Sequence, residues 1–160
     1  MDNSNDIYKV LFVCHGNICR SPMAERMMRQ MVAEAGLENR IAVGSAATSS
    51  EEEGNPIYPP ARAKLAEHGI DSSGHAARRM TWRDYDECDL LIGMDDANVR
   101  NMERIAGGDM QHKIHRLLDF TSRPGAVADP WHTDDFETTW QDVELGCRCL
   151  LNWIINEKLQ

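Results

Sequence analysis

Four short apolar segments, spaced along the chain and separated by helical patterns, are the feature that most constrains its fold. They cover residues 7–13, 41–44, 89–94 and 113–118. Each is rich in β-branched residues or leucine and is bounded by turn or capping residues, which is typical of buried strands. We therefore expect four buried strands.

Amphipathic helical patterns lie between and after these strands. The first covers 22–35, with Ser21 as the expected N-cap, Pro22 at the first helical position and a stop at Gly36. The longest has apolar residues at spacings of three and four. The remaining predicted helices cover 60–67, 81–85 (a single turn), 95–105 and 136–155.

Strands that alternate with helices predict parallel βαβ units with right-handed crossovers. The expected fold is α/β: a four-stranded parallel flavodoxin-like sheet in order 2-1-3-4, with helices on both faces. A chain of 160 residues without a repeat or long linker suits one domain over residues 1–160. Such sheets bind ligands beyond the carboxyl ends of their strands, where Cys14, Ser45, Asp95 and Asp129 are expected.

Charge and cysteine content exclude several classes of protein. The 17 basic against 26 acidic residues give a net charge of −9, which argues against a nucleic-acid binder. There is no apolar run long enough for a membrane span, and the polar N-terminus is no signal peptide, so a cytoplasmic protein is expected. The five cysteines lack the paired spacings of a structural zinc site. We expect neither a metal nor another cofactor.

The residues that follow the first strand form a strong chemical motif. They read CHGNICRSP from Cys14, with Arg20 six positions later. A strand, a tight loop and a helix N-terminus direct successive backbone N–H groups at one point, which is an anion site. Arg20 adds a bidentate cation, and Gly16 and Asn17 tolerate the positive φ that a closed loop needs. The loop predicts a nucleophilic Cys14 thiolate in a phosphate cradle, with Ser21 able to hydrogen-bond to the sulfur.

A thiolate that attacks phosphorus needs an acid for the departing oxygen and then a base for water. Asp129, in the sequence VADPWH, is the candidate, because its loop follows the fourth strand at the same edge of the sheet. The alternative is a turn residue before Pro130.

These motifs resemble the low-molecular-weight protein tyrosine phosphatases over nearly the whole chain. The Cys-x5-Arg signature also occurs in unrelated phosphatase folds, but its place near the N-terminus, with Asp-Pro far downstream, is typical of this family. Besides the loop, the matching segments are 45–48 (SAAT), 68–70 (HGI), 75–78 (HAAR), Met94-Asp95, Asn98 and Asp129-Pro130.

The resemblance implies a metal-independent mechanism in two steps. Cys14 would form a phosphocysteine while Asp129 protonates the phenolate, and Asp129 would then activate water. Arg20 and the loop would hold the phosphoryl group. The phosphate-binding residues it implies are His15, Gly16, Asn17, Ile18, Cys19, Arg20 and Ser21, and the supporting residues are Asn17, Ser21, Ser45, His75 and Asp95.

The expected substrate pocket contains Ile18, Glu51, Trp131 and His132. In this family a branched apolar residue at the position of Ile18 is associated with phosphotyrosine, and threonine with phosphoarginine. Trp131 can stack on a phenyl ring. For His132 the alternative is a surface loop histidine without a role in the pocket, and we favour that alternative. If the acidic run 51–53 rims the pocket, rather than forming a solvated loop, we expect weak use of strongly acidic peptides.

The expected partners are a phosphotyrosine-containing protein or peptide, and phosphate or a similar oxyanion, with no nucleic acid or membrane. A monomer or weak dimer is expected. Cys19 is a candidate for reversible protection of an oxidised Cys14. Three alternatives stay open: a phosphoarginine phosphatase, a thiol-dependent arsenate reductase, for which no resolving cysteine pair is evident, and a non-catalytic module that binds phosphorylated partners.

Overall fold

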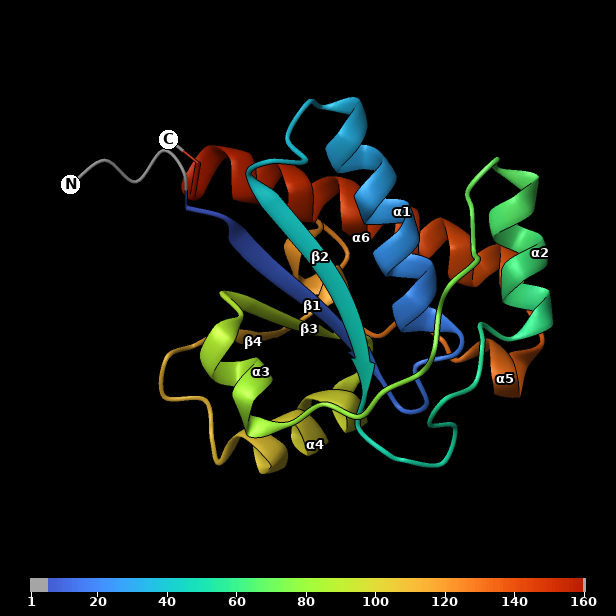
Figure 1. Ribbon diagram of the computed structural model, residues 1–160, viewed down its shortest axis with the longest axis horizontal. Helices are drawn as coiled ribbons and strands as arrows, with labels where there is room; N and C mark the ends of the chain where they lie inside the picture. The colour runs from blue at the N-terminus through green and yellow to red at the C-terminus, as the bar shows by residue number, and fades with distance from the viewer. Residues whose placement is uncertain (1–5, 160) are drawn as a thin grey trace.

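A four-stranded parallel sheet in order β2-β1-β3-β4 forms the centre of the computed structural model, which describes residues 6–159 (Figure 1). The predicted fold class and strand order are confirmed. Strand β1 pairs with both β2 and β3, so it lies in the middle of the sheet. The strands are β1 (Tyr8–Cys14), β2 (Ile41–Ala47), β3 (Leu90–Gly93) and β4 (Ile114–Arg116).

Strands β2 and β4 differ most from their predicted lengths, and the reason is how each one pairs. Strand β2 continues three residues past Gly44, because it stays in register with β1 as far as the pair Cys14–Ala47. Ser45 is therefore a strand residue. Strand β4 lies at the sheet edge and pairs only with β3, and it stops at Arg116, where the chain turns into the 3₁₀ helix η1 (Leu117–Phe120).

Helices cover both faces of this sheet (Figure 1). Helices α1 and α6 pack together on one face, α3 and α4 lie on the other, and α2 packs against α1 and α6. Within residues 6–159, no helix combines the length and apolarity that crossing a membrane requires. The helices are α1 (Arg20–Glu34), α2 (Pro59–Glu67), α3 (Trp82–Glu87), α4 (Asp96–Ala106), α5 (Pro130–Thr133) and α6 (Phe136–Glu157).

The alternation of side chains along β1 divides the core into two parts. Val10, Phe12 and Cys14 face the helices α1 and α6, whereas Leu11 and Val13 face α3 and α4. All five are buried, as expected for a central parallel strand. Cys14 therefore ends β1 on the face that α1 covers, close to where α1 begins.

The start of α1 differs from the prediction. The helix begins at Arg20 with Cys19 as its N-cap residue, and no side chain caps it. The predicted N-cap role of Ser21 is wrong, because its hydroxyl instead contacts the Cys14 sulfur and the Asn17 amide. Pro22 still lies in the first turn, where its missing N–H costs no helical hydrogen bond.

Candidate active site

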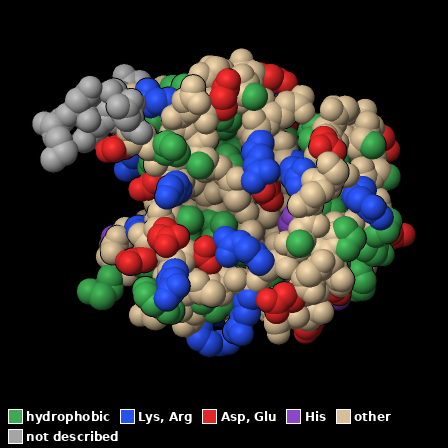
Figure 2. Space-filling model, viewed as in Figure 1, with side chains coloured by type: hydrophobic (Ala, Val, Ile, Leu, Met, Phe, Trp, Pro, Cys, Tyr) green, Lys and Arg blue, Asp and Glu red, His purple; other side chains and the backbone are tan. Residues whose placement is uncertain are grey.

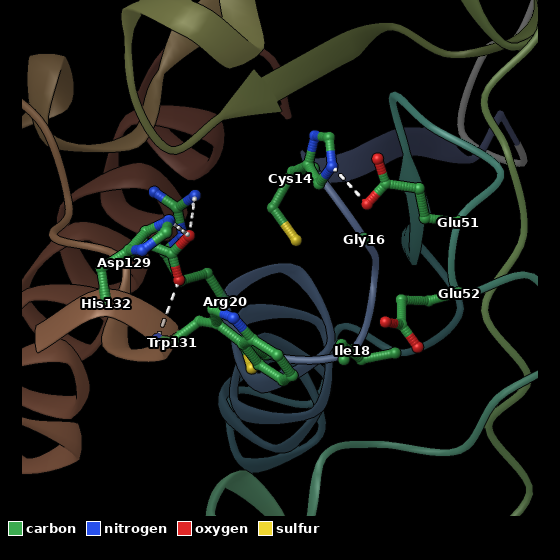
Figure 3. Close-up of a pocket in the computed structure, with 11 residues that line it drawn as sticks. Cys14, Gly16, Ile18, Arg20, Glu51, Glu52, Asp129, Trp131 and His132 are labelled. Carbon is green, nitrogen blue, oxygen red and sulfur yellow. Dashed lines mark hydrogen bonds and ion pairs between the residues drawn. The ribbon is translucent and has the colours of Figure 1, made fainter. Parts of the chain in front are cut away.

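A pocket of about 240 Å³ opens at the carboxyl ends of the strands (Figure 3). The loop between β1 and α1 forms its floor. One wall comes from the segment after β2, and the other from the N-terminal end of α5. Within residues 6–159, no group of three or more His, Cys, Asp or Glu side chains is placed to hold a metal ion. The lining residues are Cys14, His15, Gly16, Ile18, Cys19, Arg20, Glu51, Glu52, Asp129, Trp131 and His132.

Asn17 fixes the shape of the loop that forms the floor. Its backbone is left-handed, with φ of 60°, and its side chain is fully buried. The side-chain amide donates to Ser21 Oγ and Ser45 Oγ, both at 2.9 Å, and its oxygen accepts from the Arg78 N–H at 3.2 Å. His75 Nε2 donates to the Asn17 carbonyl at 2.7 Å. Four predicted supporting residues (Asn17, Ser21, Ser45 and His75) thus form one hydrogen-bonded network.

The network continues to a residue that the sequence analysis missed. The Ser45 hydroxyl donates to Glu25 Oε1 at 2.5 Å, and the other Glu25 oxygen pairs with Arg29. Glu25 is 6% exposed, so this carboxylate is held inside the protein by two partners. Because Ser45 donates to Glu25, its oxygen is free to accept from Asn17. Glu25 therefore sets the direction of hydrogen bonding under the loop.

The Cys14 sulfur points into the pocket from the end of β1 (Figure 3). Its Sγ lies 3.0 Å from Ser21 Oγ. Ser21 Oγ accepts from Asn17, so its hydroxyl proton can be donated to the sulfur or to the Ala46 carbonyl, which is farther away at 3.5 Å. The N-terminus of α1 begins at Arg20, where free N–H groups and the helix dipole favour negative charge. This arrangement suits a thiolate and an incoming phosphate.

Arg20 is buried at 3% exposure and is held by two rigid acceptors. Its Nη1 donates to Asp95 Oδ2 and to the Val127 carbonyl, each at 2.8 Å. Burial raises the pKa of Asp95, but the Arg20 hydrogen bond and the Asn98 N–H outweigh it and hold that pKa below its usual value. Asp95 is therefore charged at neutral pH, and it orients the Arg20 guanidinium beside the pocket.

Asp129 approaches the same arginine from the opposite wall. It is the N-cap of α5, where its Oδ1 accepts from the Trp131 N–H at 3.0 Å. Its Oδ2 lies 3.6 Å from Arg20 Nη2 and 3.9 Å from His132 Nε2. The sequence analysis placed Asp129 in a loop, whereas the structure gives it a fixed capping position with one oxygen turned toward Arg20.

The two walls differ in chemistry (Figure 3). On the α5 side, the Trp131 ring contacts the Tyr58 ring at a centroid distance of 4.8 Å. On the other side, Glu51 Oε2 accepts from His15 Nε2 at 3.1 Å, and Glu52 also lines the pocket. Part of the acidic run does rim the pocket, because two of its three members are lining residues.

Cys19 lies beside the loop but in a different environment from Cys14. It is 6% exposed, although it contributes to the pocket lining. Burial, together with the neighbouring Cys14, raises its pKa to about 12. Cys19 is therefore a neutral thiol at physiological pH, and a neutral thiol is a poor nucleophile.

All residues predicted for the substrate pocket line it, and the predicted supporting residues contact either the loop or Arg20. The analysis missed Glu25, Tyr58 and the Val127 carbonyl. Glu25 lies one helical turn after Ser21, a spacing that could have indicated a shared face. Contacts from Tyr58 and Val127 depend on long-range packing, for which the sequence carries no local signal.

Known proteins resemble this chain over most of its length. The family model for low molecular weight phosphotyrosine protein phosphatase matches residues 9–160. Low molecular weight protein-tyrosine-phosphatase YfkJ of Bacillus subtilis is 40% identical over 151 residues, covering 93% of this chain and 97% of that protein. The Homo sapiens low molecular weight phosphotyrosine protein phosphatase is 37% identical over 147 residues, covering 89% and 92%.

Two solved structures extend the comparison. The crystal structure of Bacillus subtilis YfkJ superposes with a TM-score of 0.93 at 39% identity, covering 96% of this chain and 98% of that one. The crystal structure of DARP, a drosophila arginine phosphatase, superposes with a TM-score of 0.82 at 27% identity, covering 90% and 96%. On the family match, the identities and the shared fold together, this chain belongs to the low molecular weight phosphotyrosine protein phosphatase family.

Proposed function

We propose that this protein hydrolyses phosphotyrosine in proteins or peptides through a phosphocysteine on Cys14. The observation that carries the proposal is one pocket lined by the Cys14 sulfur, the Arg20 guanidinium and the Asp129 carboxyl group. These three groups are a nucleophile, a phosphate-binding cation and a proton carrier. A phosphatase of this type needs all three within reach of one phosphorus atom.

In the first step, the Cys14 thiolate attacks phosphorus and the bond from phosphorus to the tyrosine oxygen breaks. Asp129, protonated at this stage, gives its proton to the departing oxygen, so that a neutral phenol leaves. The phenol has a pKa near 10, and protonation therefore removes a large part of the cost of its departure. The product of this step is a phosphocysteine and a free tyrosine side chain.

In the second step, water replaces the sulfur on phosphorus. Asp129, now a carboxylate, accepts a proton from the water as its oxygen attacks, and the phosphorus–sulfur bond breaks. The electron pair returns to Cys14 as a thiolate, which the Ser21 hydroxyl at 3.0 Å can stabilise by donating a hydrogen bond. Inorganic phosphate leaves, and Asp129 is protonated again for the next cycle.

Arg20 and the loop amides stabilise the phosphoryl group while it is transferred from the tyrosine oxygen to Cys14 and from Cys14 to water. Charge on a transferring phosphoryl group is spread over its three equatorial oxygens. Arg20 offers donors in a plane that Asp95 and the Val127 carbonyl hold in place, so little reorganisation is needed during the reaction. Loop residues 15–21, which include His15, Gly16, Ile18 and Cys19, supply the remaining contacts in this proposal.

Phosphotyrosine is favoured over phosphoarginine by the apolar side of the pocket. Ile18 and Trp131 offer surfaces suited to a phenyl ring. Phosphoarginine remains the second candidate, since a protein described as an arginine phosphatase shares the fold. Arsenate reduction is less favoured, because burial raises the pKa of Cys88 to about 11, and Cys147 is fully buried on α6.

The wider setting is part of the same proposal. We place the enzyme in the cytoplasm, working without a metal or other cofactor, as a monomer or weak dimer that binds neither nucleic acid nor membrane. An acidic chain with a net charge of −9 is consistent with a protein that avoids nucleic acid. Its partners are then the phosphorylated substrate and the phosphate product.

The test compares wild type with Cys14→Ser on a phosphotyrosine peptide, in the presence of a chelator. We expect turnover that survives the chelator and is abolished by the substitution. Phosphoarginine peptide and arsenate with a thioredoxin system serve as parallel substrates. Faster turnover of either one, or a Cys14→Ser variant as active as wild type, would contradict the proposal. Substrate binding by an inactive wild type would point to a binding module instead.

A further inference from the structure

A second pocket, of about 260 Å³, lies behind the phosphate loop and shares no lining residue with the active-site pocket. Helix α1, strand β2 and residues 74–78 form it. Figure 2 shows Lys and Arg side chains gathered over α1 and β2 on this face of the molecule. The volume lies just below the roughly 300 Å³ at which sites for drug-sized ligands begin, so a small ligand fits it best.

The charged lining of this pocket is mostly basic. Arg26, Arg29 and Arg78 contribute three cations, and Glu25 contributes one carboxylate. Arg78 is also paired with Asp84, through hydrogen bonds of 3.1 and 2.9 Å. A cationic pocket in a chain with a net charge of −9 runs against the overall charge of the protein.

Arg26 is the arginine of this pocket that forms no close ion pair within the described part of the chain, although its charge helps to lower the pKa of the nearby Asp71. Its Nη1 donates to the Asp71 backbone carbonyl at 3.2 Å. Its Nε is shielded from solvent and has no hydrogen-bond partner among residues 6–159. A buried donor left without a partner is uncommon and costs free energy. An anion in the pocket would supply the missing acceptor, and a guanidinium fork suits phosphate oxygens in particular.

We propose that this pocket is a second anion site, which binds inorganic phosphate or a small organic phosphate and acts on the phosphate loop from behind. The site lies outside the proposed reaction, and its existence does not depend on that reaction. Phosphate is the product of the proposed activity, however, so one natural consequence is control of the enzyme by its own product.

Three lining residues connect the pocket to the loop. Glu25 accepts from Ser45, Ser45 accepts from Asn17, and His75 donates to the Asn17 carbonyl. A bound anion would repel the Glu25 carboxylate and attract Arg29, which now pairs with Glu25. Both effects loosen the support of Asn17, which holds the loop in its left-handed turn. We therefore expect an occupied site to lower kcat.

A phosphate titration followed by NMR tests the binding directly. With ionic strength held constant by sodium chloride, we expect inorganic phosphate to shift the amide signals of Gly44 and Gly74, and separately that of Gly16 in the active site. Arg26→Gln should raise the phosphate Kd obtained from the Gly44 and Gly74 signals by about tenfold, since a charge-assisted hydrogen bond is lost. Arg26→Lys, which keeps the charge, should recover part of that affinity.

The controls separate this site from the active site. Arg100→Gln removes the same charge from an exposed position on α4 and should titrate as wild type. In kinetic assays, phosphate should lower kcat and raise KM for wild type, but only raise KM for Arg26→Gln. The second site does not exist if the Gly74 signal does not shift while the shift of the Gly16 signal saturates. The same holds if the Gly74 signal shifts equally in wild type and Arg26→Gln. The NMR measurement needs no turnover, so its outcome does not depend on the proposed catalysis.

Discussion

Asp95 and Asp129 share position and partners, yet their geometry fits them for different tasks. Each caps a helix at the carboxyl edge of the sheet, and each lies beside Arg20. Their side chains are exposed to nearly the same extent, 25% and 28%. The distances differ, because Asp95 Oδ2 accepts from Arg20 at 2.8 Å, whereas Asp129 Oδ2 lies 3.6 Å away.

The difference shows why similar carboxyl groups cannot exchange roles. Both oxygens of Asp95 are occupied, one by Arg20 and the other by the Asn98 N–H, and its pKa is held low. Asp129 uses one oxygen for the Trp131 N–H and turns the other toward the pocket. A carboxylate that must take and release a proton needs an oxygen that no hydrogen bond occupies, whereas one that orients an arginine needs hydrogen bonds to both oxygens.

The largest effect is expected from Asp129→Asn. Asparagine keeps the capping oxygen but cannot donate an acidic proton, so kcat on phosphotyrosine should fall by roughly 10²- to 10⁴-fold. With a phenol made acidic by electron-withdrawing groups, the first step no longer needs the acid, but the second still needs the base. Stopped-flow measurement should then record a burst of about one phenol per enzyme, followed by slow turnover.

Asp134→Asn is the matched control for this experiment. Asp134 ends α5 in a left-handed conformation with φ of 59°, which asparagine also adopts readily. Its activity should equal that of wild type. If Asp129→Asn retained wild-type turnover on an unactivated substrate, Asp129 would be a capping residue alone, and the contrast with Asp95 would be lost.

Asp95→Asn should have the next largest effect, because it weakens the hold on Arg20 without removing the cap of α4. We expect kcat/KM to fall by about tenfold, the loss that follows from one charge-assisted hydrogen bond. Inhibition by inorganic phosphate should weaken in parallel, since Arg20 binds both. The dependence of rate on leaving-group acidity should stay as in wild type, and a change in that dependence would mean that Asp95 takes part in proton transfer.

The same variant predicts a pH dependence of stability. The pKa of Asp95 is lower in the folded chain than its ordinary value of 3.8. Its charged form therefore stabilises the fold above pH 3.8, and that contribution is lost as the pH falls through the folded pKa. Urea unfolding at pH 7 should find Asp95→Asn less stable than wild type, with a smaller difference at pH 3. A difference that grows on acidification would contradict the low pKa.

The contrast between Asp95 and Asp129 also separates what the sequence could predict from what it could not. The strand order and the loop from Cys14 to Arg20 depend on local patterns of apolar and turn residues, and these were predictable. The sequence brought Asp95 and Asp129 to one edge, but it could not assign the distances of 2.8 and 3.6 Å to Arg20. Those depend on how α4 and α5 begin, and α5 is a single turn with little periodic signal.

A smaller effect, on substrate recognition, is expected at the pocket wall that contains Glu51 and Glu52. Glu51 and Glu52 face the pocket from the side opposite Asp129, and Glu51 is 69% exposed and paired with His15. Replacing both by glutamine should raise kcat/KM for acidic phosphopeptides by roughly fivefold at low salt, because like-charge repulsion is removed. The gain should shrink as salt is added. A basic phosphopeptide serves as the comparison substrate, and its kcat/KM should fall in the same variant. A wild type that prefers acidic residues beside the phosphotyrosine would contradict this interpretation.

Trp131→Ala should have the smallest effect and separates the two tasks of the α5 wall. The backbone N–H of residue 131 holds Asp129 Oδ1, and alanine supplies the same N–H. The indole ring, packed 4.8 Å from the Tyr58 ring, can contribute only a surface for the substrate phenyl group. Loss of one aromatic contact should raise KM for phosphotyrosine by about two- to tenfold, with kcat nearly unchanged. If kcat falls tenfold at constant KM instead, the indole itself positions Asp129, and the freedom assigned to that carboxyl group is wrong.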